Sequence, residues 1–223
     1  MRVRDIMTAT VVTATSNTTF QDLVDLMLRH GVSGVPIVDA EHRPIGIVTE
    51  ADLIAKEAYR SLRGRPADPT TGRQENAWGA KARGLRAGQL MTSPVRTACP
   101  QDLVRMAAAR MVTTGVNRLP VVETDGRLVG IVSRDDVLRI FHRDDDDVAK
   151  EVERTLADPL TVPAGHAVRA SVQHGVVTLN GSVGQASHAG LVEGAVRELP
   201  GVVDVISELT VAEGIGEPNR AKA

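Results

Sequence analysis

The sequence repeats itself at a constant spacing of 84 residues. Met7-Thr8 returns as Met91-Thr92, and residues 7–54 align with residues 91–138 without a gap. Of the 48 aligned pairs, 15 are identical, and most of the remaining core pairs are apolar in both copies. A gapless alignment of this length is not expected by chance. The chain therefore contains a tandem duplication and is expected to fold the same unit twice.

Each copy predicts the same order of elements: strand, helix, strand, strand, helix. Apolar residues at helical spacing predict the first helix, and a glycine (Gly31 or Gly115) then stands where a C-terminal cap is usual. Two short apolar runs joined by a polar turn predict paired strands. The expected strands are residues 11–13, 35–39 and 44–48 in the first copy and 95–97, 119–123 and 128–132 in the second. The expected buried residues of the first helices are Phe20, Leu23, Val24, Met27 and Leu28, and Leu103, Val104, Ala107, Ala108 and Met111; the closing helices begin at Glu50 and Arg134.

The pattern changes from Val148 onward and predicts a separate small domain. Its order is helix, strand, strand, helix, strand, with His174-Gly175 as the hairpin turn between the first two strands. This order predicts a small α+β sheet covered by helices on one side. The expected elements are a helix over 148–156, strands over 167–172 and 176–179, a helix over about 186–198 with Leu191, Ala195 and Val196 on its apolar face, and a strand over 202–211.

Composition narrows the function classes. Cys99 is the only cysteine, which excludes an intrachain disulfide and a cysteine-based zinc site. Aromatic residues make up 2% of the chain and the net charge is -2, so we expect no nucleic-acid partner. The chain contains no phosphate-loop, HExxH or CxxC motif and no nucleophile–base motif, so we expect no enzyme activity. No apolar run reaches the roughly 20 residues of a membrane span, and the start lacks the apolar core of a signal peptide, so we expect a cytoplasmic protein.

A hydroxyl residue and an aspartate end the duplicated unit in both copies, as Thr49 with Asp52 and Ser133 with Asp136. One interpretation is structural, because a hydroxyl can cap a helix and an acid in the first turn is favoured by the helix dipole. The other is binding, because a carboxylate can accept two ribose hydroxyls while a hydroxyl and free helix N–H groups suit a phosphate. Both interpretations stay open from the residues alone.

Four longer phrases carry a family resemblance. GVSGVPIVD (31–39) with GIVTEADL (46–53), and GVNRLPVVE (115–123) with GIVSRDDVL (130–138), resemble a tandem pair of cystathionine-β-synthase (CBS) domains, a Bateman module. VRASVQHGVVTLNGSV (168–183) and AVRELPGVVDVISEL (195–209) resemble a BON domain, a module named for bacterial osmotic-shock-protective and nodulation proteins. The fold class is therefore predicted as α/β (α+β), with two β-α-β-β-α repeats in one pseudo-symmetric module and an α-β-β-α-β domain. The expected parts are CBS repeat 1 (1–60), a basic linker (61–85), CBS repeat 2 (86–143), an acidic linker (144–147), the BON domain (148–212) and a disordered tail (213–223).

The resemblance implies where a ligand would bind. It implies that Asp contacts ribose, that Thr or Ser faces phosphate, and that each cleft is built from both repeats. One cleft would combine Val32, Ser33 and Gly34 with Arg118, Ser133 and Asp136, and the other Val116, Asn117 and Leu119 with Thr49 and Asp52; Thr13 completes the ligand-binding set. Some nucleotide-binding relatives place a phosphate-binding Arg where Arg118 stands, whereas its counterpart in the first copy is Gly34. A phosphorylated ligand is therefore expected at the Asp136 cleft, and a neutral adenosyl compound or nothing at the Asp52 cleft; a solvated or interface ion pair is the alternative for Arg118.

The expected function is that of a regulatory sensor. The CBS pair would bind AMP, ADP, ATP, NAD(H) or S-adenosylmethionine and signal to the BON domain, which would contact a phospholipid surface or a protein partner. The resemblance also implies a homodimer formed through the CBS helices. No obligatory cofactor and no metal are expected, since the acidic run Asp144–Asp147 is interpreted as a cap for the next helix. The alternative is a ligand-free dimerisation or interaction scaffold with BON as the docking module.

Overall fold

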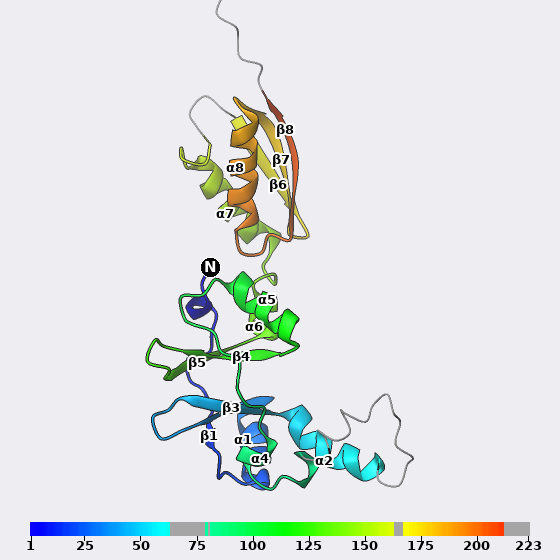
Figure 1. Ribbon diagram of the computed structural model, residues 1–223. Helices are drawn as coiled ribbons and strands as arrows, with labels where there is room; N and C mark the ends of the chain where they lie inside the picture. Colours follow the sequence, from blue (N-terminus) through cyan, green and yellow to red (C-terminus); the bar gives the residue numbers. More distant parts are fainter. Residues whose placement is uncertain (63–78, 80, 163–166, 212–223) are drawn as a thin grey trace, which may run out of the picture. The chain divides into compact units, whose positions relative to one another are not determined.

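The computed structural model describes residues 1–62, 79, 81–162 and 167–211 (Figure 1). The predicted disordered tail and most of the predicted linker lie outside these residues. The chain divides into two compact units, Met1–Asp136 and Val137–Ala223, here called the N-terminal unit and the C-terminal unit.

The N-terminal unit contains the predicted duplication. Gly34 lies opposite Thr49 on the paired strands of the first copy, and Arg118 lies opposite Ser133 at the same positions of the second. Gly31 and Gly115 end their helices in left-handed conformation, as predicted. After a short 3-10 turn η1 (Val3–Asp5), the first copy forms β1 (Ala14–Thr15), α1 (Phe20–His30), β2 (Gly34–Val38), β3 (Pro44–Thr49) and α2 (Glu50–Leu62). The second copy begins after α4 (Ala87–Leu90) and forms α5 (Val104–Thr114), β4 (Arg118–Val122), β5 (Leu128–Ser133) and α6 (Arg134–Arg139).

Two predictions for these repeats need correction. The first strand pairs about three residues later than expected: Ala14 pairs in parallel with Ile37, and Ala98 bridges Val121. Ala14 and Ala98 are buried against the neighbouring strand, and this packing outweighs the higher strand propensity of the preceding Val and Thr residues. Leu28, predicted to be buried, is 77% exposed. The core side of α1 follows Leu23 and Met27, and a residue one step further along a helix points about 100° away.

The first residues of each copy pair with a strand of the other copy. Thr92 of the second copy bridges Ile47 of the first, and Thr8 of the first bridges Ile131 of the second. Next to these bridges Met91 lies against Gly46 and Met7 against Gly130, where an added Cβ would stand 2.6 Å from the Met7 sulfur. The repeated methionine and the repeated glycine therefore contact each other across the copies, which joins the two repeats into one unit.

Two aliphatic cores fill the N-terminal unit. The first is built around Leu23, Ile37 and Leu90, and the second around Met111, Leu119 and Val121. All six side chains are almost completely buried from solvent, and none is aromatic. A chain with so few aromatic residues must obtain its burial energy from such aliphatic side chains.

The C-terminal unit has the predicted α-β-β-α-β order. Its sheet has the strand order β6-β7-β8, in which β7 is antiparallel to β6 and parallel to β8. Both helices cover one face of this sheet (Figure 1), where Val152 and Val196 pack on Val177 and Leu179. The elements are α7 (Asp145–Ala157), β6 (Ala167–Gln173), β7 (Val176–Val183), α8 (Ala186–Arg197) and β8 (Asp204–Val211).

Two details of this unit differ from the prediction. Val192 and Val196 form the buried side of α8, whereas Leu191 is 63% exposed, because positions four apart share a helix face and adjacent positions do not. The helix α7 begins at Asp145, so three residues of the acidic run form its first turn. The predicted hairpin is present, with positive φ at both His174 and Gly175, as a tight two-residue turn requires.

Candidate functional site

A cavity of about 870 Å³ lies in the N-terminal unit beside Thr49, at the N-terminus of α2. One wall comes from the β3–α2 junction of the first repeat. The other comes from the segment before α5 and from the α5–β4 turn of the second repeat. The lining residues are Ser33, Ile47, Thr49, Glu50, Ala51, Thr92, Ser93, Pro94, Val95, Arg96, Thr113, Thr114, Gly115, Val116, Asn117 and Arg118.

Asp52 lies next to this cavity and is 8% exposed. Its Oδ2 accepts hydrogen bonds from the Thr49 backbone N–H at 2.8 Å and from the Thr49 hydroxyl at 2.9 Å. Its Oδ1 forms an ion pair with the ammonium group of Lys81, which also donates to the Thr92 hydroxyl at 2.9 Å. The carboxylate therefore already has partners on both oxygens.

Asp136 repeats the first part of this arrangement in the second copy. Its Oδ2 accepts from the Ser133 backbone N–H at 2.8 Å and from the Ser133 hydroxyl at 2.7 Å. The Asp136 N–H donates back to the Ser133 hydroxyl at 3.3 Å, which completes a reciprocal helix cap. Capping is thus realised in the structure, while ligand contact by the same groups stays a prediction.

Arg118 contacts the two residues of the first repeat with which it was grouped in one predicted cleft, Ser33 and Gly34. Its Nη2 donates to the Ser33 hydroxyl, and its side chain covers Gly34, where an added Cβ would lie 2.6 Å from Nη1. The glycine thus leaves the space that the guanidinium occupies. Burial lowers the pKa of Arg118 from its ordinary value, while the negative charges of Glu50, Asp135 and Asp136 act in the opposite direction. Within the described part of the chain, the buried Arg118 Nε has no hydrogen-bond partner.

The positive charge beside Asp52 was not predicted. Arg118 contacts Ser33 and Gly34, with which it was grouped, and it also lines the cavity beside Thr49 together with Arg96. Lys81 adds a further cation, which contacts Asp52. The extended Arg118 side chain reaches from the second repeat to Ser33 of the first. Its position in the strand does not by itself predict where the end of so long a side chain lies.

The remaining predicted residues are distributed over the unit. Val116, Asn117 and Ser33 line the cavity together with Thr49. Leu119 is completely buried in the second core, Val32 packs partly buried on the first core, and Thr13 lies half-buried before β1. Seven of the predicted residues are not among those that line this cavity: Thr13, Val32, Gly34, Asp52, Leu119, Ser133 and Asp136.

Sequence reasoning missed the wall formed by residues 92–96. The repeat contained the necessary signal, because Thr13 was predicted to contact ligand and its counterpart 84 residues later is Thr97, next to this wall.

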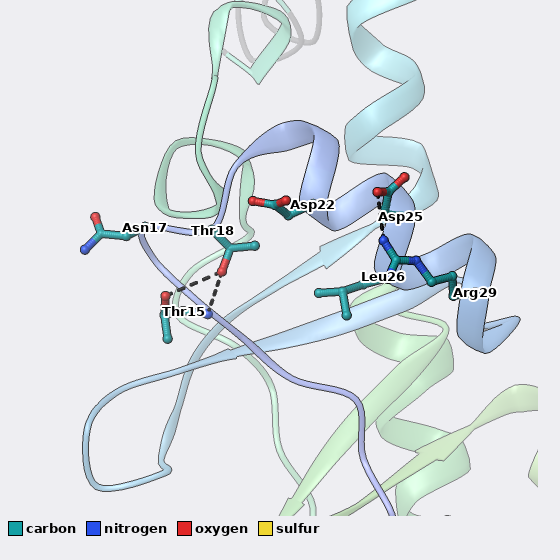
Figure 2. Close-up of a pocket in the computed structure, with 7 residues that line it drawn as sticks. All are labelled: Thr15, Asn17, Thr18, Asp22, Asp25, Leu26 and Arg29. Carbon is teal, nitrogen blue, oxygen red and sulfur yellow. Dashed lines mark hydrogen bonds and ion pairs between the residues drawn. The ribbon is translucent and has the colours of Figure 1, made fainter.

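A second hollow of about 470 Å³ lies at the start of α1 (Figure 2). Asp25 forms an ion pair with Arg29 at 3.0 Å, and the Thr15 backbone N–H donates to the Thr18 hydroxyl at 3.1 Å. The acids Asp22 and Asp25 outnumber the single cation Arg29 in the lining, so the hollow carries a net negative charge, which disfavours a phosphate. Its lining residues are Thr15, Asn17, Thr18, Asp22, Asp25, Leu26 and Arg29. The cavity beside Thr49 is therefore the better candidate for an anionic ligand.

Residues 1–62, 79, 81–162 and 167–211 contain no group of three or more His, Cys, Asp or Glu side chains placed to hold a metal ion. None of the helices formed by them has both the length and the apolar character needed to span a bilayer.

Comparison with known proteins gives matches over nearly the whole chain. The CBS domain family matches residues 3–59 and 87–143, and the BON domain family matches residues 144–213. MK0525 of Methanopyrus kandleri is 30% identical over 138 residues, which are 62% of this chain and 61% of that protein. The chloroplastic CBS domain-containing protein CBSX1 of Arabidopsis thaliana is 29% identical over 131 residues, 55% of each chain. The chain therefore spans about three fifths or less of these relatives.

Two solved structures of CBS pairs resemble the N-terminal part. CBSX2 of Arabidopsis thaliana in complex with AMP has a TM-score of 0.53 at 29% identity, covering 62% of this chain and 94% of that chain. The CBS domain pair of protein MJ0100 in complex with 5′-methylthioadenosine and S-adenosyl-L-methionine has a TM-score of 0.51 at 25% identity, covering 64% and 96%. The element orders agree with the family matches: the duplicated β-α-β-β-α unit covers the CBS matches, and the α-β-β-α-β domain covers the BON match. The chain therefore belongs to the CBS domain family, with two CBS domains followed by a BON domain.

Proposed function

We propose that this protein is a non-enzymatic regulatory sensor whose CBS pair binds an adenine nucleotide or an adenosyl compound. The observation that carries the proposal is the cavity of about 870 Å³ beside Thr49, with Arg96 and Arg118 in its wall. Its volume lies within the range of about 300–1,000 Å³ usual for small-molecule sites.

The chemistry of the wall suits the parts of a nucleotide. In the proposed complex the adenine ring lies against the wall segments 92–96 and 115–118. The first turn of α2 presents backbone N–H groups at the positive end of the helix dipole, which favours a phosphate. Arg96 and Arg118 add permanent charge. Asp52, which is hydrogen-bonded to the lining residue Thr49, is proposed to contribute a carboxylate to ribose. CBSX2 with AMP and the MJ0100 pair with 5′-methylthioadenosine and S-adenosyl-L-methionine support this ligand class.

The output of the sensor is proposed to pass through the BON domain. Val203, Ile206 and Val211 are each about half exposed along β8 and its approach, which favours a docking role toward a protein or a phospholipid surface. Leu28, Ile54 and Val112 are exposed apolar residues on α1, α2 and α5, which supports a homodimer through the CBS helices. The cytoplasmic location stays part of the proposal. The alternative, a ligand-free scaffold, would use the same surfaces without occupying the cavity.

A thermal-shift and calorimetric screen separates the sensor from the scaffold. AMP, ADP, ATP, NAD(H), 5′-methylthioadenosine and S-adenosylmethionine are each titrated into the full chain. A ligand at 100 times its Kd should stabilise the protein by roughly 2.7 kcal/mol. If none of these compounds binds or moves the melting temperature, the sensor proposal fails.

Matched variants then locate the site. Asp52→Asn keeps the shape of the carboxylate but not its charge, and we expect it to weaken AMP binding at the Thr49 cavity. Asp136→Asn makes the same change in the other repeat and is expected to leave binding at that cavity intact. Equal effects of the two substitutions would contradict the placement.

A further inference from the structure

The contact between Lys81 and Asp52 is not part of the duplicated unit. Lys81 lies between the two aligned ranges, 7–54 and 91–138, so the repeat supplies no counterpart for it. The Lys81 ammonium joins Asp52 of the first repeat to Thr92 of the second, and Thr92 lines the cavity. The two ion-pair side chains are only 24% and 11% exposed, so the pair is largely shielded from solvent screening.

The hydrogen-bond capacity of Asp52 limits what else it can bind. A carboxylate offers about four lone-pair sites. The backbone N–H and the hydroxyl of Thr49 occupy both sites of Oδ2, and Lys81 occupies one site of Oδ1. One site remains, whereas the two hydroxyls of a ribose need two. With Lys81 in place, Asp52 can therefore accept a hydrogen bond from one ribose hydroxyl but not from both.

Lys81 also determines the charge of the site. With Lys81 in place the Asp52 charge is neutralised, and the cavity wall carries Arg96 and Arg118 against Glu50. The local balance is then positive. Without Lys81 the uncompensated Asp52 carboxylate would make the same site approximately neutral.

We propose that Lys81 is a specificity-determining residue of the Thr49 cavity. It keeps Asp52 neutralised, so that the cavity favours phosphorylated nucleosides over neutral and cationic adenosyl compounds. This inference rests on the proposed function and adds the charge class of the ligand to it.

The test compares ligands that share adenosine but differ in charge. AMP is an anion, 5′-methylthioadenosine is neutral, and S-adenosylmethionine carries a sulfonium cation. Their Kd values are measured by isothermal titration calorimetry on the full chain in an Asp136→Asn background, so that the second repeat contributes less to the signal. The chain with Lys81 intact should bind AMP more tightly than 5′-methylthioadenosine, and S-adenosylmethionine most weakly.

Substitution of Lys81 should change this order. In Lys81→Met the preference for AMP over 5′-methylthioadenosine is expected to fall about tenfold, equivalent to about 1.4 kcal/mol. Lys81→Arg keeps the charge and should retain the preference. The double variant Lys81→Met/Asp52→Asn removes both charges of the ion pair. Its preference for AMP over 5′-methylthioadenosine should therefore return toward that of the chain with Lys81 and Asp52 intact, although it should bind each of the two compounds more weakly.

The outcomes distinguish the two proposals. An AMP preference that stays within twofold in Lys81→Met, or equal binding of AMP and S-adenosylmethionine to the chain with Lys81 intact, overturns the role of Lys81 and leaves the adenine sensor standing. Absence of binding by all three compounds overturns both. The ligand order with Lys81 intact needs no substitution at Lys81, so it can overturn the role of Lys81 even if Lys81→Met fails to fold, and Lys81→Arg with the double variant then tests whether Lys81 is the source of the order.

Discussion

The acidic run before α7 contributes a specific contact at the residue scale. The Asp145 carboxylate accepts hydrogen bonds from the backbone N–H groups of His174 at 2.7 Å and Gly175 at 2.8 Å. These bonds, that from Gly175 most strongly, lower the pKa of Asp145 below its ordinary value of 3.8. The first turn of α7 thus holds the hairpin turn between β6 and β7.

The lowered pKa of Asp145 gives a pH dependence with a defined sign. Because the folded state favours the ionised carboxylate, its stabilisation is fully present above the unfolded value of 3.8 and is lost as pH falls through the lower folded pKa. Asp145→Asn should therefore lower the melting temperature of the C-terminal unit at pH 7 and reduce its further loss below pH 3.8. Thermal melts followed by circular dichroism from pH 7 to pH 2.5 measure both effects.

Asp146→Asn is the control for that experiment. Asp146 lies in the same helical turn and has the same relation to the helix dipole, but it is exposed. It should leave most of the acid dependence in place. Equal pH profiles for the two variants would assign the effect to the dipole and not to the hairpin contact.

The residue scale is also where sequence reasoning reached its limit at the candidate site. Thr49, Val116 and Asn117 were identified from motif positions, and all three line the cavity. Lys81 was not identified, because it contacts Asp52 across 29 residues of sequence from outside the repeat. Motifs predict side chains that the repeated fold holds in place, but they carry no information on where a long side chain from a connecting segment ends.

At the scale of elements, two glycines of the C-terminal unit predict opposite effects of the same substitution. Gly181 in β7 has φ 135°, and an added Cβ would overlap the backbone carbonyl oxygen of Ala167 on β6. A residue with a side chain is strained at this φ, and the backbone of Ala167 cannot move aside without disturbing the sheet. Gly181→Ala should destabilise the unit by more than about 2 kcal/mol, measured by urea unfolding.

Gly194 in α8 is the matched opposite case. It lies inside a helix, and an added Cβ there would meet nothing within 4 Å. Alanine exceeds glycine in helix propensity by about 0.8–1.0 kcal/mol, so Gly194→Ala should raise the unfolding free energy by about that amount. A destabilising result would mean that the exposed side of α8 has a contact that the isolated chain does not reveal.

Elements were predictable in kind and order, but less so in their boundaries. The period of apolar residues identified α1, α5, α7 and α8, and turn residues identified the hairpin at His174-Gly175. The first strand was misplaced because its pairing depends on Ala14 and Ala98, small residues that fit close to a neighbouring strand but have low strand propensity. Packing between elements, which the sequence does not display locally, decides such positions.

At the scale of the whole molecule, the separate cores predict separate unfolding transitions. The C-terminal unit buries its own cluster around Val152, Val177 and Val196, and the N-terminal unit buries two others. Differential scanning calorimetry of the full chain should resolve two transitions. Gly181→Ala should lower one of them strongly, which identifies it as the transition of the C-terminal unit.

The sensor proposal makes a further demand on these two transitions. A ligand that occupies only the CBS pair must raise the transition of the N-terminal unit by mass action. If the bound state is communicated to the BON domain, the other transition must also move, since coupling between two sites typically amounts to about 1–3 kcal/mol and acts in both directions. We expect AMP to shift both transitions in the unsubstituted protein and to shift both much less in the double variant Asp52→Asn/Asp136→Asn. A BON transition that stays in place while the CBS transition rises would show that binding and output are uncoupled, and would favour a domain that docks independently of the ligand.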